Sequence, residues 1–329
     1  MTKNKASVKS IPDFETIGTV IRTTGTSCHV RTQSGEEFPC QVKGNFRIKG
    51  IRTTNPVAVG DKVKISGSNN EVRFITEILP RKNYIIRRAS NLSKESHILA
   101  SNIDLALLIA TVKEPATSTT FIDRFLATAE AYDVEAAIVI NKEDTWDEED
   151  REYAEALKNL YVSIGYTVLF VSALTGYGVD SLKDLLKNKT TLVAGNSGVG
   201  KSSLINAIVP GLALRTGDIS DVHHTGMHTT TFSEMISLPE GGEVIDVPGV
   251  RGFGTIDFKP EETDHYFPEI FKASQECKYG DCRHTNEPGC NVKNAVENHF
   301  ISESRYASYL SILEESDSEE GADKYRKPF

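Results

Sequence analysis

The sequence predicts an α/β protein in three parts: an all-β N-terminal domain, an α/β domain with a parallel sheet, and a helical metal-binding region. Its 329 residues exceed what one ordinary domain uses. Short alternating strands fill the first part, and strands alternate with helices in the second. Three of the five cysteines lie within 14 residues near the C-terminus. We expect the parts to cover residues 1–90, 91–258 and 259–329.

The first part consists of short strand patterns. Residues 17–79 contain five of them, separated by Gly, Asn and Ser turns and not interrupted by a helical pattern. Five strands in about 70 residues fit a small closed barrel. The strand count and the positive charge favour an OB-type barrel, with an SH3-like barrel as the alternative. Cys28 and Cys40 fall in strand patterns and are expected in the barrel core.

The charge of the chain is distributed unevenly. Residues 1–90 carry 16 Lys and Arg against 7 Asp and Glu, a net charge of +9, whereas the rest of the chain carries −18. Four basic residues crowd the connection before the fourth strand, with Phe46 among them. Such a run can be only a solvated loop, but the surplus over the whole domain favours RNA binding. The four residues are Lys43, Arg47, Lys49 and Arg52.

The sequence also bears on location. No apolar run approaches the roughly 18–20 residues of a membrane helix, and the first 15 residues lack the apolar core of a signal peptide. The cysteines are clustered, unlike those of a secreted disulfide framework. We therefore expect a cytoplasmic protein without membrane contact.

A phosphate-binding motif carries the clearest chemical signal. The segment GNSGVGKS, residues 195–202, follows an apolar strand and precedes a helix, as a P-loop does. Its backbone N–H groups can surround phosphates, Lys201 can neutralise the β- and γ-phosphates, and the Ser202 hydroxyl can reach Mg²⁺. The expected nucleotide-binding residues here are Gly195, Asn196, Ser197, Gly198, Val199, Gly200, Lys201, Ser202 and Ser203.

A D-x-x-G motif follows the P-loop. Asp246 ends a strand, and Gly249 comes three residues later. Asp246 can hold Mg²⁺ through a water molecule, and the Gly249 N–H can contact the γ-phosphate.

Two further motifs indicate which base is bound. Asn141, Lys142, Glu143 and Asp144 form N-K-x-D at a strand end. The Asp144 carboxylate can accept hydrogen bonds from the ring N–H and the exocyclic amine of guanine, a pair that adenine does not offer. The Ser172-Ala173 pair ends the next strand and can present a backbone N–H to guanine O6. The predicted ligand is therefore GTP, with GDP as product.

The order of these motifs is unusual. In ordinary small GTPases the P-loop comes first, whereas here N-K-x-D at 141 and S-A-L at 172 precede the P-loop at 195. The sequence thus predicts a circularly permuted P-loop GTPase domain. Each motif is placed by its own strand, so permutation leaves the site intact.

The polar segment 221–235 is the expected switch I. Thr229 or Thr230, with Thr230 preferred, could complete the Mg²⁺ coordination. Val250 follows D-x-x-G where many GTPases carry a water-orienting Gln, so this role needs another group. His228 is the candidate catalytic residue, an ordinary loop histidine being the alternative. His223 and His224 are weaker candidates.

The cysteine cluster predicts a metal site. Cys277, Cys282, His284 and Cys290 supply three thiolates and an imidazole, the donor set of a closed, structural Zn²⁺ site. The last residues, 314–329, are so polar that we expect an acidic tail that frays.

These motifs together resemble the RsgA (YjeQ) family, over nearly the whole chain and in order: barrel, RRASN connector, NKED, SAL, GNSGVGKSS, HTTT, DVPGVRGFG and the Cys/His cluster. The resemblance implies a GTPase that is stimulated by the small ribosomal subunit, binds its rRNA and assists its late maturation. It also implies that the histidine of HTT, here His228, is catalytic.

Other expectations accompany this resemblance. Partners would be the small subunit and further maturation factors, and the protein would be a monomer. A longer basic loop in the barrel and the acidic tail depart from the family pattern. The alternative function is a regulatory G protein that acts on a protein partner through an adaptor barrel. An intact nucleotide site disfavours a purely structural RNA-binding protein.

Overall fold

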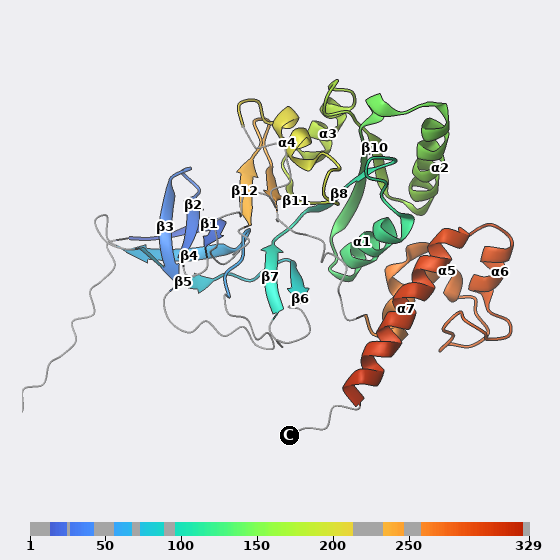
Figure 1. Cartoon of the computed structure of the whole chain (residues 1–329). Helices are drawn as coiled ribbons and strands as arrows, with labels where there is room; N and C mark the ends of the chain where they lie inside the picture. Colours follow the sequence, from blue (N-terminus) through green and yellow to red (C-terminus); the bar gives the residue numbers. More distant parts are fainter. Residues whose placement is uncertain are drawn as a thin grey trace, which may run out of the picture. The chain divides into compact units, whose positions relative to one another are not determined.

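The computed structural model (Figure 1) describes residues 14–24, 27–42, 56–67, 73–88, 96–212, 233–246 and 258–324. The chain divides into two compact units. The first comprises Met1–Asn102 and Phe232–Met235, and the second comprises Ile103–Thr231 and Ile236–Phe329. Among the described helices, none is long and apolar enough to cross a membrane.

Five strands of the first unit close into a barrel. β1 pairs with β2 and β4, β2 with β3, and β4 with β5, all antiparallel, while the parallel pair β3–β5 closes the ring. This arrangement confirms the OB-type barrel predicted from the strand count. The strands are β1 (Phe14–Thr24), β2 (Ser27–Thr32), β3 (Glu37–Val42), β4 (Lys62–Gly67) and β5 (Arg73–Ile78).

The barrel core follows from the alternation of apolar and polar residues along each strand. Cys28 of β2 and Cys40 of β3 are register partners and both are buried, as predicted. Burial raises the pKa of the Cys28 thiol to about 12 and that of Cys40 to about 11, so both stay neutral in the core. The basic connection that contains Arg47 lies outside the described residues.

A hairpin of β6 (Tyr84–Arg88) and β7 (Ser96–Ser101) belongs to the same unit. A buried ion pair joins Arg81, just before the hairpin, to Asp61, just before β4, at 2.6 Å. The hydroxyl of Ser101, the last residue of β7, donates to the same carboxylate oxygen, Asp61 Oδ1, at 2.6 Å. Asp61 is thus fully buried with its charge compensated, which ties the hairpin to the barrel.

The second unit contains a parallel sheet. Its strands lie in the order β10 (Thr167–Phe170), β9 (Glu135–Asn141), β8 (Leu105–Thr111), β11 (Thr190–Ala194) and β13 (Glu243–Asp246). β12 (Glu234–Ser237) precedes β13 in the chain. All seven residues of β8 are buried, as expected of a strand covered on both faces. Because the strands are parallel, their carboxyl ends meet at one edge.

Four helices connect these strands: α1 (Thr119–Ala131), α2 (Glu148–Ile164), α3 (Val179–Leu186) and α4 (Lys201–Ile208), and the short η1 (Glu143–Thr145) precedes α2. Ser118 caps α1 by accepting from the Phe121 N–H. Asp147 and Asp150 form a reciprocal capping box at the start of α2. The apolar faces of α3 and α4 pack in one core with β8, β9 and β11.

The C-terminal region is helical, as predicted. It consists of η4 (Pro260–Tyr266), α5 (Pro268–Ser274), α6 (Asn291–Glu297) and α7 (Glu303–Lys324). α7 is helical through Lys324, although the polar composition led us to expect fraying. The first half of α7 buries Tyr309, Ile312 and Leu313, and a helix held in this way propagates at little further cost.

α7 attaches this region to the α/β domain by packing beside α1 (Figure 1). Arg305 of α7 and Asp123 of α1 form an ion pair at 3.0 Å, and both side chains are fully buried. Asp123 also accepts from Tyr161 at 2.8 Å and from Ser308 at 2.6 Å, and Arg305 donates to Glu269 at 2.6 Å. The pair is therefore surrounded by hydrogen bonds that compensate its burial.

Replacing Arg305 by Ala should destabilise the protein by about 3–5 kcal/mol, because Asp123 would remain buried without its cation. Arg124→Ala is the matched control, since Arg124 joins the same two helices through an ion pair with the exposed Glu315. That change should cost less than about 1 kcal/mol. Urea unfolding followed by circular dichroism measures both, and equal effects would contradict the role given to the buried pair.

Candidate nucleotide and metal sites

The P-loop lies between β11 and α4 and depends on its glycines. Gly195 has φ 148° and Gly200 has φ 91°. A Cβ atom on Gly195 would lie 2.3 Å from the Ile109 carbonyl oxygen, and one on Gly200 would lie 2.4 Å from Asn141 Nδ2. Glycine is therefore required at both positions by conformation and by space.

Lys201 begins α4 and reaches back over the loop. Its Nζ donates to the Gly195 carbonyl at 2.9 Å and to the Asn196 carbonyl at 2.7 Å. The ammonium group is thus held at the mouth of the loop, beside the N-terminus of α4 where Ser202 and Ser203 follow. A cation and a helix N-terminus together favour phosphate binding.

Asn141, at the end of β9, joins three of the motifs. Its Nδ2 donates to the Val199 carbonyl of the P-loop at 2.8 Å, and its Oδ1 accepts from the Ala173 N–H at 3.2 Å. The side chain is buried. Asn141 therefore fixes the N-K-x-D and S-A-L loops against the P-loop, which is a structural role that the motif alone did not reveal.

The carboxylate of Asp144, which the N-K-x-D motif predicts to read the base, is oriented by a serine. The Ser172 hydroxyl donates to Asp144 Oδ1 and accepts from the Thr175 N–H at 3.1 Å. Glu143 points elsewhere and pairs with Arg151 of α2 at 2.5 Å. The two adjacent carboxylates therefore have different partners: Glu143 pairs with α2, and Asp144 is held beside the S-A-L loop.

The loop after β8, residues 112–118, also borders the P-loop, and sequence analysis did not identify it. Lys142 Nζ donates to the Glu114 carbonyl, and a Cβ atom on Gly198 would lie 3.3 Å from Pro115 Cδ. Lys113 pairs with Asp150 at the start of α2. The available signal was the position of the loop at the carboxyl end of a parallel strand.

The remaining nucleotide-site predictions are only partly described. Asp246 ends β13 and pairs in register with Val193, two residues before the P-loop, so the strand brings it to the phosphate end of the site. Seven residues of interest lie outside the described residues: His223, His224, His228, Thr229, Thr230, Gly249 and Val250.

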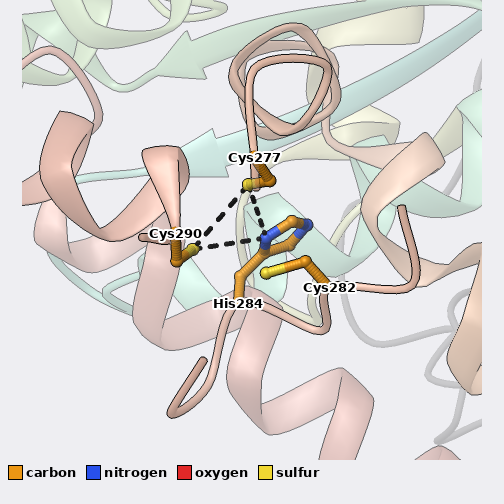
Figure 2. Close-up of side chains that lie close together, drawn as sticks. All are labelled: Cys277, Cys282, His284 and Cys290. Carbon is orange, nitrogen blue, oxygen red and sulfur yellow. Dashed lines mark hydrogen bonds between the residues drawn. The ribbon is translucent and has the colours of Figure 1, made fainter. Parts of the chain in front are cut away.

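The four predicted metal ligands converge, as Figure 2 shows. Their ligand atoms all lie within 4.8 Å of one another. The Cys277 and Cys290 sulfurs are 3.9 Å apart, and His284 Nδ1 lies 3.6 Å and 3.5 Å from them. Tetrahedral Zn²⁺ would separate two sulfurs by about 3.8 Å and a sulfur from a nitrogen by about 3.6 Å. The Cys₃His cluster, which includes Cys282, could therefore bind zinc.

The start of α6 supplies backbone donors to two of these sulfurs. The Asn291 N–H donates to Cys277 Sγ at 3.3 Å, and the Lys293 N–H donates to Cys290 Sγ at 3.5 Å. Burial opposes ionisation of Cys277, but the N–H groups of Val292 and Asn291, together with His284 and Cys282, outweigh it and lower the pKa of the thiol. These donors favour the thiolate, which is the form that binds metal.

The backbone of the cluster is held by residues that sequence analysis missed. Glu287 accepts hydrogen bonds from the N–H groups of Arg283 and Thr285, each at 2.9 Å. Tyr306 and Tyr309 of α7 donate to the carbonyls of His284 and Arg283 at 2.5 and 2.9 Å. α7 thus supports the metal cluster as well as the contact with α1.

These features define a circularly permuted GTPase with an OB-type barrel and a Cys₃His cluster. The family model described as RsgA GTPase matches residues 78–256, and the one described as RsgA N-terminal domain matches residues 17–75. The chain belongs to the RsgA GTPase family, whose members are hydrolases that act on GTP, and it therefore uses GTP, GDP and Mg²⁺. The resemblance noted in the sequence is confirmed.

Individual relatives cover almost the full chain. A protein of Bacteroides fragilis (strain YCH46) named small ribosomal subunit biogenesis GTPase RsgA is 58% identical over 312 residues, which is 95% of this chain and 99% of the relative. A Porphyromonas gingivalis (strain ATCC 33277) protein of the same name is 55% identical over 317 residues, again 95% and 99%.

Two solved structures share the fold. YjeQ from Thermotoga maritima superposes with a TM-score of 0.76 at 37% identity, covering 92% of this chain and 99% of that one. YloQ, described as a circularly permuted GTPase, gives 0.70 at 31% identity, covering 97% and 99%. The permuted motif order predicted from the sequence is therefore a property that this chain shares with a solved relative.

Asp144→Asn should weaken GTP binding by roughly 100-fold or more, because each hydrogen bond to a charged group contributes about 1.5–3 kcal/mol. The same variant should gain affinity for xanthine nucleotides, whose 2-oxo group can accept from the new amide. Displacement of a fluorescent guanine nucleotide measures both affinities. Glu143→Gln, a neighbouring carboxylate-to-amide change, should leave them unchanged, and unaltered GTP affinity of Asp144→Asn would refute the assignment.

Proposed function

We propose that this protein assists late maturation of the small ribosomal subunit, hydrolysing GTP to GDP and phosphate with turnover stimulated by that subunit. The observation that carries the proposal is 58% identity, over 95% of the chain, to a protein of that name. The contacts of Asn141 with the P-loop and with the S-A-L loop also support the proposal, because they hold these three motifs together. A regulatory G protein with an adaptor barrel is not favoured, because the similarity includes the barrel.

The proposed roles of the nucleotide-site residues follow from the sequence motifs and, for the described residues, from their contacts. The P-loop amides and Lys201 bind the phosphates, and Asn141 and Asp144 hold and read guanine. Ser202 and Thr230 are the proposed Mg²⁺ ligands, and Asp246 acts through a water molecule. Bound Mg²⁺ supplies charge neutralisation on the phosphates. We expect the Gly249 N–H to contact the γ-phosphate, as D-x-x-G motifs do.

The proposed partners follow from charge and family. The barrel of residues 1–90, with its net charge of +9, is the part we assign to rRNA. Residues 91–258 form the GTPase domain, and residues 259–329 form the zinc-binding region with its acidic tail. We expect a monomer that also meets other maturation factors, acting in the cytoplasm where small subunits are assembled.

The test of this function is GTP hydrolysis with and without purified small subunits, together with subunit binding across a salt series. Stimulated turnover and binding that falls steeply with salt support the proposal, because phosphate contacts release counterions. A protein lacking residues 1–90 should keep nucleotide binding and lose most subunit binding. Salt-insensitive binding by that truncated protein would favour the adaptor function instead.

Zinc bound at the Cys₃His cluster should stabilise the C-terminal region by about 10 kcal/mol, since metal binding free energy contributes to folding. Chelation should therefore reduce the helical circular dichroism of the protein. Atomic spectroscopy should find one zinc per chain in the unaltered protein and in Cys40→Ala, whose cysteine lies in the barrel, and none in Cys282→Ser. Zinc-free protein purified without chelator would contradict the assignment.

His228→Ala should lower subunit-stimulated turnover by roughly 10²–10³-fold while preserving GTP and subunit binding, because a water-orienting group acts only in the transition state. Single-turnover hydrolysis with saturating small subunit measures the effect. Val250→Ala and His224→Ala are the controls and should retain most of the activity. Full stimulation of His228→Ala would assign the water-orienting role to another group.

A further inference from the structure

His284 has one ring nitrogen that the metal cluster does not use. Nδ1 faces the sulfurs of Cys277 and Cys290, whereas the other nitrogen, Nε2, points away from them (Figure 2). The side chain is 1% exposed, and among the described residues Nε2 has no hydrogen-bond partner. An unsatisfied buried polar atom costs about 1–3 kcal/mol, so its surroundings require an explanation.

The nearest acceptor is a carboxylate from a different element. Asp264 of η4 places Oδ2 3.6 Å from His284 Nε2, slightly beyond hydrogen-bond distance. Its Oδ1 lies 3.8 Å from Nε2 of the half-exposed His265. A small rotation of the His284 ring, or of the carboxylate, would bring Asp264 and His284 into a hydrogen bond.

We infer that Asp264 is the positioning residue of the metal site, and this inference rests on the proposed zinc binding. Its carboxylate accepts a hydrogen bond from His284 Nε2–H when the metal occupies Nδ1. The bond fixes the tautomer in which Nδ1 is free to coordinate and holds the ring in the plane the metal needs. Asp264 itself does not touch the metal.

The charge of the site indicates that Asp264 orients His284 and does not act only by adding negative charge near the metal. Three thiolates and Zn²⁺ already sum to −1, so a further half-buried carboxylate is unfavourable unless it is hydrogen-bonded. The Asp264 carboxylate faces His284 and the half-exposed His265, and the Ser274 side chain also hydrogen-bonds to it. Of these groups, the buried His284 Nε2 is the atom that has no hydrogen-bond partner among the described residues.

The same contact connects two parts of the region. η4 is the first described element after the D-x-x-G motif, and its neighbour Phe267 packs in the core with Tyr309 of α7. A hydrogen bond from His284 to Asp264 therefore ties the metal cluster to the segment that leaves the nucleotide site.

Zinc release from the full-length, zinc-loaded protein to a chromogenic chelator tests the inference. Asp264→Ala should bind zinc roughly 10–100-fold more weakly, the usual effect of removing such a partner. Asp264→Asn should fall between Asp264→Ala and the unaltered protein, because the amide oxygen still accepts from Nε2–H. Asp281→Asn, the matched control, removes the same charge from an exposed position between the ligands Cys277 and Cys282 and should change affinity less than twofold.

Two spectroscopic measurements separate positioning from a merely structural effect. ¹⁵N NMR of labelled histidine should show His284 protonated at Nε2 in the zinc-loaded protein, and the Co²⁺ visible absorption of Asp264→Ala should differ from that of Asp281→Asn. Asp264→Ala and Asp281→Asn with equal zinc affinity and equal spectra would overturn the positioning role. If the unaltered protein bound no zinc, the metal site itself would fall, and the inference with it.

Discussion

A single buried ion pair, Asp123–Arg305, is the constraint that fixes the C-terminal helices against the α/β domain. Both side chains are fully buried, so the pair is stable only while every surrounding donor and acceptor stays in place. Arg305 also fixes Glu269 of α5, and the next turn of α7 supplies Tyr309 to the backbone of the metal cluster. The helix α7 therefore contacts both the Cys₃His cluster and the helix α1.

The nucleotide site illustrates a second constraint, which is that parallel strands deliver their carboxyl ends to one edge. The chain order of the motifs is then unimportant, because β8, β9, β10, β11 and β13 reach that edge whichever strand comes first. Asn141 links the motifs at this edge, because its side chain hydrogen-bonds to both the P-loop and the S-A-L loop. Permutation has one physical consequence: the segment after D-x-x-G leads directly into the metal-binding region, so these two parts are neighbours along the chain.

In both sites the motif residues are held by groups that no motif contains. Pro115 borders Gly198 of the P-loop. Glu287 accepts hydrogen bonds from the backbone N–H groups of Arg283 and Thr285, on either side of His284. Asp264 faces the buried nitrogen of His284. The chemistry of such a site resides in a few short segments, while its rigidity depends on packing from several elements. Changes outside the motifs can therefore alter affinity without touching a ligand.

The sequence by itself determined what depends on local chemistry. Strand alternation predicted the barrel, the segment 195–202 predicted a phosphate loop between strand and helix, and the spacing of Cys277 to Cys290 predicted a metal cluster. Each of these patterns lies in a short stretch of sequence, where backbone conformation, charge and donor type can be read directly. Only the tertiary structure decided the partners that are far apart in sequence, such as Asn141 with Val199, 58 residues apart, and Asp123 with Arg305, 182 residues apart. Nothing in local periodicity encodes such pairs, because packing of whole helices and strands selects which polar groups meet in the core. Tertiary packing likewise decided where α7 is held, since Tyr309, Ile312 and Leu313 of its first half share one core with α1.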